Sequence, residues 1–431
     1  MNICIFGTHA ATHFATQILL KEANVKHVHH LIGNAAIPPS SRYSNIDTAL
    51  LLESNFNHDP LIIDYLNNNQ IDLTVLMSST YLCNQVLQDK LTELAIPSAS
   101  CNFKHGELEW CKATGKSLLI KAGIKTPRSK LLKKKDLFEK FFEIPRPFVL
   151  KFVRDWRAGL QTLIITDENC QGEFENLQEF GQTRMVFQFG EFSDQKFLIE
   201  EYIQGQREYS YHFISNDLGW KYMGSARDYK KFDDGDQGFN TAGMGSYSPV
   251  EINPKVHEYA EKIYNHLREQ GTCYKGIMYL GIIEDTSGEP WVLEINTRPG
   301  DPEFQSIVLS YGDDFSLSKM FYQCANNLEI EDQFQPQLHA VSLRVVHSRY
   351  REFINLLAKK ELHKLGAIPN PHIYPEPPDL YINYGSDRRL LNSVISASAS
   401  SRAEAADKIY KFLNNVAMND FTYRKDIGYL I

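Results

Sequence analysis

The first hundred residues alternate short apolar runs with segments of helical periodicity, and this alternation limits the possible fold more than any other feature. The expected strands are 2–6, 27–32 and 73–77, and the expected helices are 13–21, 60–66 and 84–94. Strands and helices that alternate at this spacing are typical of parallel sheets with helical crossover connections. The pattern therefore predicts an α/β domain with a doubly wound parallel sheet over residues 1–104.

The loop after the first expected strand, Gly7-Thr-His-Ala-Ala11, lies at the sheet edge where such domains bind ligands. It holds a single glycine and so lacks the G-x-G-x-x-G pattern that lets a dinucleotide approach the backbone. A nicotinamide cofactor is therefore not expected.

The charge balance argues against several classes of partner. The chain has 45 Lys and Arg against 53 Asp and Glu, a formal charge of −8, which disfavours non-specific binding to nucleic acid or anionic membrane. No apolar stretch approaches the ~18 residues of a membrane span, and the amino terminus has no basic flank of a signal peptide. The seven cysteines include no C-x-x-C pair, so neither a disulfide framework nor a zinc site is indicated. We expect a soluble, cytoplasmic monomer without a nucleic-acid or membrane partner.

The middle of the chain is predicted to be rich in strands. Two strands within 148–165 flank a polar turn, and a hairpin is expected from 276–283 and 290–296. The charge-rich segment 130–143 is interpreted as the solvated face of a helix. A second helix is expected after Pro254, and its inward residues are Val256, Tyr259, Ile263 and Leu267.

The last hundred residues are interpreted as a small α+β domain, 335–431. A strand is expected at 340–346, and Ser401 with Glu404 forms a capping box that predicts a helix to about Asn414.

A polar motif ends the expected strand 290–296. Glu294 and Asn296 lie two positions apart, so both side chains point to one face of the strand, and Arg298 continues that face. A carboxylate and an amide oxygen together suit Mg²⁺, while an arginine can stabilise charge on a transferring phosphoryl group. Glu-x-Asn alone equally fits a solvated strand end; the Gly/Pro-rich segment that follows it favours a ligand loop.

A glycine-rich segment covers residues 226–249. Its glycines allow close backbone approach to an anion, Lys230 supplies positive charge, and Asp228 and Asn240 can orient an amine or a hydroxyl. Taken alone, such a loop also fits a structural turn.

Four motifs together resemble one family. Segments 228–249, 274–281, 293–305 and 423–429 follow the order and spacing of the glycinamide ribonucleotide synthetases, the phosphoribosylamine–glycine ligases of the ATP-grasp superfamily. The resemblance implies a pre-ATP-grasp domain at 1–104, an ATP-grasp domain at 105–334 with a mobile lid at about 125–196, and the α+β domain at 335–431.

The resemblance also implies roles for individual residues. Those similar to the family's ATP-binding positions are Lys112, Lys151, Glu200, Glu201, Tyr202, Ile203 and Glu208. Those similar to its substrate-binding positions are His13, Asn34, Asn240, Thr241, Gly243, Met244, Gly245 and Asp301. The implied catalytic residues are Arg298, Lys230 and Asp228, and the implied metal ligands are Glu294 and Asn296.

The implied reaction is an ADP-forming carboxylate–amine ligation with ATP and Mg²⁺ (or Mn²⁺). Glycine is converted to an acyl phosphate, and the amine of phosphoribosylamine then displaces phosphate, as one step of purine biosynthesis. Positioning and charge neutralisation are sufficient for such chemistry.

Three departures from the family pattern leave alternatives open. The first loop lacks the family's Arg-Glu before His13, Met77-Ser-Ser79 replaces Gly-Pro-Glu, and the lid loop Arg154-Asp-Trp-Arg-Ala-Gly159 lacks a glycine and a lysine. The first two changes remove polar partners for phosphoribosylamine. The alternatives are a ligase that uses a different amine acceptor and a non-catalytic nucleotide-binding homologue.

Overall fold

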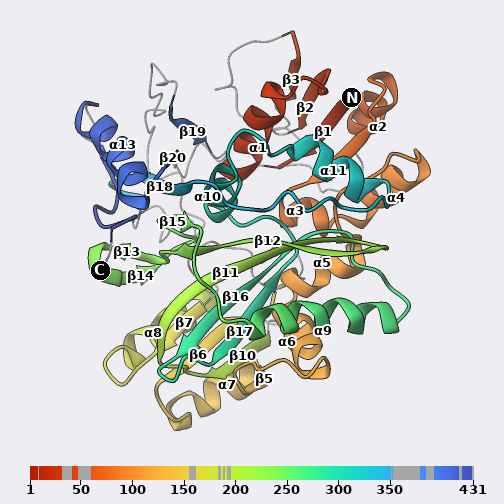
Figure 1. Ribbon diagram of the computed structural model, residues 1–431. Helices are drawn as coiled ribbons and strands as arrows, with labels where there is room; N and C mark the ends of the chain where they lie inside the picture. The colour runs from red at the N-terminus through yellow and green to blue at the C-terminus, as the bar shows by residue number, and fades with distance from the viewer. Residues whose placement is uncertain are drawn as a thin grey trace.

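The structure is a computed structural model, which describes residues 1–7, 9–31, 41–46, 60–154, 162–182, 186–187, 190–191, 196–350, 352, 379–384, 393–416 and 420–429. Asn34 and residues 155–159 of the lid turn lie outside the described residues. The described residues form three larger sheets (Figure 1).

The amino-terminal sheet is parallel, as the sequence predicts. Its strand order is β3-β2-β1-β4, and β1, β2 and β4 are almost entirely buried. The strands are β1 (Asn2–Phe6), β2 (His27–Leu31), β3 (Tyr43–Ile46) and β4 (Leu73–Leu76). The helices of this region are α1 (Ala10–Lys21), α2 (Pro60–Asn68), α3 (Ser79–Leu82) and α4 (Gln85–Glu93).

Two helices lead from this region into a second, antiparallel sheet of order β5-β10-β6-β7. Its strands are β5 (Ser129–Lys133), β6 (Phe148–Phe152), β7 (Thr162–Ile165) and β10 (Lys196–Glu201), and a short hairpin pairs β8 (Val186–Phe187) with β9 (Gly190–Glu191). The helices are α5 (Phe103–Trp110), α6 (Lys112–Lys121), α7 (Lys134–Lys140), η1 (Phe141–Glu143) and α8 (Cys170–Gln182). A separate apolar core that includes Leu137, Phe141 and Phe197 holds this unit together.

The helix expected over 130–143 begins only at Lys134. Residues 129–133 form β5 instead, because they pair with β10 in an antiparallel ladder from Glu200↔Ser129 to Lys196↔Lys133. An edge strand tolerates exposed lysines, so its charge pattern resembles a solvated helix face.

The largest sheet has nine strands among the described residues and is antiparallel throughout them, in the order β17-β16-β11-β12-β15-β18-β20-β19, with β21 paired to β18. Its strands are β11 (Gly205–Asn216), β12 (Gly219–Asp228), β15 (Gly245–Ser248), β16 (Gly276–Asp285), β17 (Pro290–Asn296), β18 (His339–His347), β19 (Tyr381–Tyr384), β20 (Ser393–Ala399) and β21 (Phe421–Thr422). The helices of this region are α9 (Lys255–Glu269), α10 (Glu303–Ser310), α11 (Leu317–Ala325) and α13 (Arg402–Asn414). A hairpin of β13 (Lys231–Asp233) and β14 (Gln237–Asn240) encloses the turn η3 (Asp234–Asp236).

Most of the elements predicted for the second half of the chain are present. The four inward residues expected on α9 are all buried, and the hairpin predicted before Asn296 is β16–β17. The α+β segment after residue 335 adds β18, β20 and β19 to the same sheet as β11 and β12, so the central and carboxyl-terminal parts share one continuous sheet. Within the described residues, no helix has the length and apolar character that a membrane crossing needs.

Candidate active site

The predicted metal ligands lie together at the end of β17. Asn296 Nδ2 donates a hydrogen bond to Glu294 Oε1 at 3.3 Å, and Lys112 Nζ donates to Glu294 Oε2 at 2.9 Å. Burial opposes the charged form of Glu294, but Lys112, Lys151 and Lys230 outweigh it and hold the pKa of this carboxyl well below its usual range. The side chains therefore share one face, as the two-residue spacing requires, and Glu294 stays an anion.

These two side chains fit a magnesium ion. They offer a carboxylate and an amide oxygen at one place, which is the hard oxygen chemistry that Mg²⁺ prefers, and Mg²⁺ ordinarily takes only one or two carboxylates from a protein when phosphates supply the rest.

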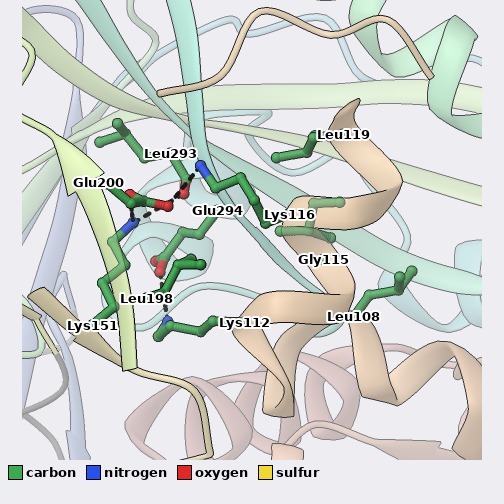
Figure 2. A pocket seen from close by; sticks show the side chains of 11 residues that line it. Leu108, Lys112, Gly115, Lys116, Leu119, Lys151, Leu198, Glu200, Leu293 and Glu294 are labelled. Atoms are coloured by element: carbon green, nitrogen blue, oxygen red, sulfur yellow. Dashed lines mark hydrogen bonds and ion pairs between the residues drawn. The ribbon is translucent and has the colours of Figure 1, made fainter. Parts of the chain in front are cut away.

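A pocket lies beside Glu294 (Figure 2). The charged residues that line it are Lys112, Lys116, Lys151, Glu200 and Glu294. Both predicted ATP-binding lysines thus line the pocket beside the predicted metal ligand, although they come from different elements, α6 and β6. Lys112 lies at the first position of its helix, and its backbone N–H donates to the carbonyl of Val153 at 3.0 Å, which links α6 to the end of β6.

Glu200 is buried between two lysines. Its Oε1 lies 2.7 Å from Lys116 Nζ and its Oε2 lies 2.8 Å from Lys151 Nζ. Burial disfavours the charged form of Glu200, but the two ammonium groups prevail and lower its pKa. The side chain of Glu200 is thus paired with two lysines. A hydrogen bond from Glu200 to the adenine base of a nucleotide would therefore use its backbone.

The other predicted residues of this strand end lie nearer the surface. Glu201 is bound through its carboxylate to the backbone N–H and the side chain of Arg128, at 2.7 and 2.8 Å, and its own N–H donates to the Arg128 carbonyl at 3.0 Å. Tyr202 is exposed and Ile203 is partly buried, directly after β10 ends.

A second charged cluster lies at the end of β12. Asp228 is buried and forms an ion pair with Lys230, whose pKa rises well above its ordinary value: burial works against the charge, but Asp228 and Glu208 favour it. Burial raises the pKa of Glu208, with opposing effects from Lys230 and from Asp228. The charges that act on Glu208 thus come both from Lys230 and Asp228 and from Glu294 and Lys151 of the pocket.

The glycine-rich segment is held by its own backbone. Thr241 donates from both its N–H and its Oγ1 to the carbonyl of Lys230, at 2.7 and 2.9 Å, and accepts from the N–H of Gly243 at 3.0 Å. Met244 N–H donates to Tyr229 O, and Gly245 O accepts from Tyr229 N–H, at 2.7 and 2.9 Å. Asn240, on β14, pairs with Lys231 across the hairpin. The predicted segment thus folds back onto Lys230, and its Gly243 has a φ of +112°, a conformation that favours glycine.

Arg298 and Asp301 are both tied down by partners that the sequence did not reveal. Arg298 Nε donates to Glu109 Oε1 at 2.9 Å, and Arg344 Nη2 lies 3.1 Å from Asp301 Oδ2. Arg344 Nε also donates to the carbonyl of Gly243 at 2.6 Å, so it joins the glycine-rich segment to the loop after β17.

Comparisons with known proteins agree with this geometry. Residues 111–304 match the family model described as "Phosphoribosylglycinamide synthetase, ATP-grasp (A) domain". This segment is thus similar to the ATP-grasp domain of that family. The resemblance to this family predicted from the motifs is confirmed, and the matched residues include every charged residue that lines the pocket and both charged clusters.

Similarity extends beyond the ATP-grasp domain. A phosphoribosylamine–glycine ligase of Streptococcus pneumoniae is 26% identical over 448 residues, which cover 99% of each chain. The crystal structure of the phosphoribosylamine–glycine ligase of Thermotoga maritima superposes with a TM-score of 0.71 at 22% identity, covering 99% of this chain and 100% of that one. A biotin carboxylase of Campylobacter jejuni, solved with β-γ-ATP, has a TM-score of 0.70 at 16% identity and covers 99% of this chain and 94% of its own. These likenesses show the fold that the chain shares with these two proteins.

The ATP-grasp domain contains a further acidic residue that no motif role had singled out. Glu303 begins α10 and is buried, and burial together with Asp228 raises its pKa to about 8. A Cβ built on Gly300 would lie 2.8 Å from Glu303 Oε2 and 3.0 Å from His212 Nε2, so this carboxyl packs directly against the loop backbone. Its place in the Gly-Asp-Pro-Glu motif was the one signal in the sequence that pointed to it.

The amino-terminal residues assigned to substrate binding are uncharged. His13 lies on α1 and is buried, and burial together with His30 lowers its pKa to about 3. His9 directly precedes α1, and its Nε2 lies 3.4 Å from Ser78 Oγ. Burial together with Arg298 lowers the pKa of His9 to about 4. The ends of β1 and β4 therefore meet beside the loop that holds Arg298 and Asp301.

The carboxyl-terminal motif anchors the hairpin β13–β14 (Figure 1). Arg424 is fully buried and donates to Asp236 Oδ1 at 2.8 Å and to the carbonyl of Lys231 at 3.0 Å. Asp426 accepts from Arg424 Nε at 2.8 Å and from the N–H of Gly235 at 2.9 Å. The last motif of the chain thus holds the segment that begins at Lys231, next to Lys230.

Proposed function

We propose that this chain is an ADP-forming carboxylate–amine ligase that joins glycine to 5-phosphoribosylamine at the expense of ATP, a step of purine biosynthesis. One observation carries the proposal: Glu294, Lys112 and Lys151 line one pocket, and Asn296 is hydrogen-bonded to Glu294, inside a segment that matches the family's ATP-grasp domain. The names of the relatives that match almost the whole chain support the same reaction.

In the first step, the carboxylate of glycine attacks the γ-phosphorus of ATP, which gives an acyl phosphate and releases ADP. Lys112 and Lys151 would receive the phosphates, because both ammonium groups face the pocket beside Glu294. Bound Mg²⁺, held by Glu294 and Asn296, would neutralise phosphate charge there.

In the second step, the amine nitrogen attacks the acyl carbon, phosphate leaves and the nitrogen loses one proton. Asp228 is suited to orient the ammonium of glycine, because it is buried and its Oδ1 has no hydrogen-bond partner among the described residues. Lys230 and Arg298 would stabilise the negative charge that develops on the departing phosphate.

We also propose the domain boundaries 1–104, 105–334 and 335–431, a monomeric state and a cytoplasmic location. The continuous sheet from β17 to β19 supports a close association of the second and third parts.

The experiment compares ADP release, with ATP, glycine and phosphoribosylamine present, by the wild type and by Glu294→Gln. Loss of this carboxylate removes the metal ligand and should lower kcat by about 100-fold or more. Glu289→Gln is the matched control, because Glu289 lies on the same hairpin but pairs with Lys255 at 2.6 Å, away from the pocket. Equal turnover by Glu294→Gln and the wild type would refute the assignment.

A specific observation supports a second candidate, a ligase with a different amine acceptor. Residues 1–20, 27–41 and 43–89 contain no lysine or arginine, so the loops at the carboxyl ends of the amino-terminal strands offer a sugar phosphate no cation. The nearby histidines His9 and His13 are neutral at pH 7. A panel of phosphorylated and unphosphorylated amines distinguishes the candidates, since faster turnover with an unphosphorylated amine would favour the second.

A further inference from the structure

Lys116 belongs to a buried row of three charges in which Glu200 lies between Lys116 and Lys151 (Figure 2). The side chains of Lys116, Glu200 and Lys151 are only 5%, 2% and 6% exposed, respectively. The proposed reaction uses Lys151 at the nucleotide phosphates but gives Lys116 no role.

The row connects elements that are distant in sequence. Lys116 lies one turn after Lys112 on α6, so both lysines face the pocket, as residues four apart on a helix do. Its Nζ also donates to Thr126 Oγ1 at 2.6 Å, and Thr126 donates in turn to the carbonyl of Val292 at 2.7 Å. At the other end of the row, Lys151 Nζ donates to the carbonyl of Leu293 at 3.1 Å, next to Glu294.

The balance of charges explains why two lysines are needed. With Lys116 in place, the three side chains carry a net charge of +1, and that excess is available to a polyphosphate. Without Lys116, Glu200 and Lys151 cancel one another, and the carboxylate holds the ammonium group that should meet the nucleotide. In a site this buried, such interactions are screened far less than at the surface.

We propose that Lys116 is a positioning residue for nucleotide binding: it neutralises Glu200, so that the charge of Lys151 is directed to the phosphates of ATP. This inference rests on the proposed function, because it takes the pocket to be the nucleotide site. Lys116 itself contacts Glu200 and Thr126, and it acts through Lys151.

The ionisation of the row supports this division of roles. Burial and the charge of Lys151 lower the pKa of Lys116 to about 8, although Glu200 opposes the shift. Burial also works against charge on Lys151, but Glu200 and Glu294 raise its pKa above the ordinary value. The charged groups that act on Lys116 are Glu200, Lys151 and Glu294, and those that act on Lys151 are Glu200, Glu294 and Glu208. As pH rises through about 8, Lys116 loses its charge while Lys151 keeps its own, so nucleotide affinity should fall.

The test measures binding of ATP with Mg²⁺ by isothermal titration calorimetry for five proteins: the wild type, Lys116→Met, Glu200→Gln, the double variant and a control, Lys121→Met. Lys116→Met should weaken binding by about tenfold or more, equivalent to about 1.4 kcal/mol. The double variant restores the net charge of +1, so it should bind within about threefold of the wild type. Lys121→Met, on the exposed end of the same helix, should bind like the wild type.

Each result has a definite consequence. Unchanged affinity in Lys116→Met, or a double variant as weak as Lys116→Met, would overturn the inference, since a merely structural lysine would not be rescued by removal of a carboxylate. If Lys116→Met does not fold, the ATP affinities of the wild type and Lys116→Arg are compared from pH 7 to 9.5. The wild type should lose ATP affinity above pH 8, and the arginine variant should not. Equal dependence of the two affinities on pH would overturn the inference. A wild type that binds no ATP would instead refute the proposed function.

Discussion

Replacing Arg424 by methionine should loosen the hairpin β13–β14 without unfolding the rest of the molecule. Arg424 is 0% exposed, and its guanidinium is bonded to two aspartates and one carbonyl. Methionine keeps much of the side-chain length but removes every one of these hydrogen bonds, so Asp236 and Asp426 lose their common partner.

The magnitude follows from the burial of the partners. Removing one member of a buried ion pair costs about 3–5 kcal/mol when the other charge stays buried. Asp236 is 43% exposed and Asp426 is 15% exposed, so both can recover part of their hydration. We therefore expect a loss of about 2 kcal/mol in local stability, which corresponds to about 30-fold faster amide exchange in the hairpin.

The assay is hydrogen–deuterium exchange followed by mass spectrometry on the peptide that covers residues 231–240. Lys425→Met is the control, because the Lys425 side chain is exposed. The backbone N–H of Lys425 donates to Asp234 Oδ1 at 2.7 Å, and the substitution retains this hydrogen bond. The KM for glycine should rise in Arg424→Met, since the hairpin starts next to Lys230. Exchange rates in 231–240 that stay within about threefold of the wild type would refute this reasoning.

Two further predictions concern the acidic cluster and the loop beside it. Burial and Asp228 raise the pKa of Glu303 to about 8, so the contribution of Glu303 to stability is complete below the ordinary carboxyl range and is lost as pH rises through 8. The unfolding temperature of the wild type should therefore fall more between pH 6 and 9 than that of Glu303→Gln. Parallel curves of unfolding temperature against pH would contradict this assignment. A Cβ at Gly243 would lie 2.9 Å from Asp228 Oδ1 at a φ of +112°, whereas one at Gly235 would contact nothing within 4 Å at a φ of +67°. Gly243→Ala should therefore lower the free energy of unfolding by about 1–3 kcal/mol more than Gly235→Ala, as measured by urea denaturation. Equal urea midpoints for the two variants would show that the contact does not destabilise the protein.

The sequence by itself determined the elements whose signal is local. The parallel sheet of residues 1–104 and the buried face of α9 both follow from the spacing of apolar residues. The shared face of Glu294 and Asn296 follows from the two-residue period of a strand. Where two local patterns coincide, as in the lysine-rich β5, the sequence favoured a helix wrongly, because an exposed edge strand and a helix surface tolerate the same charges.

The tertiary structure alone decided how the charged side chains are paired. Lys116 with Glu200, Arg344 with Asp301 and Arg424 with Asp236 are separated by tens to hundreds of residues. From the sequence alone, each of these charged residues is expected at the solvent-exposed surface, because a lone lysine or arginine is most often exposed. Burial of such charges is tolerable only when a partner from another element arrives at hydrogen-bond distance, and the path of the chain, not any local period, brings that partner there.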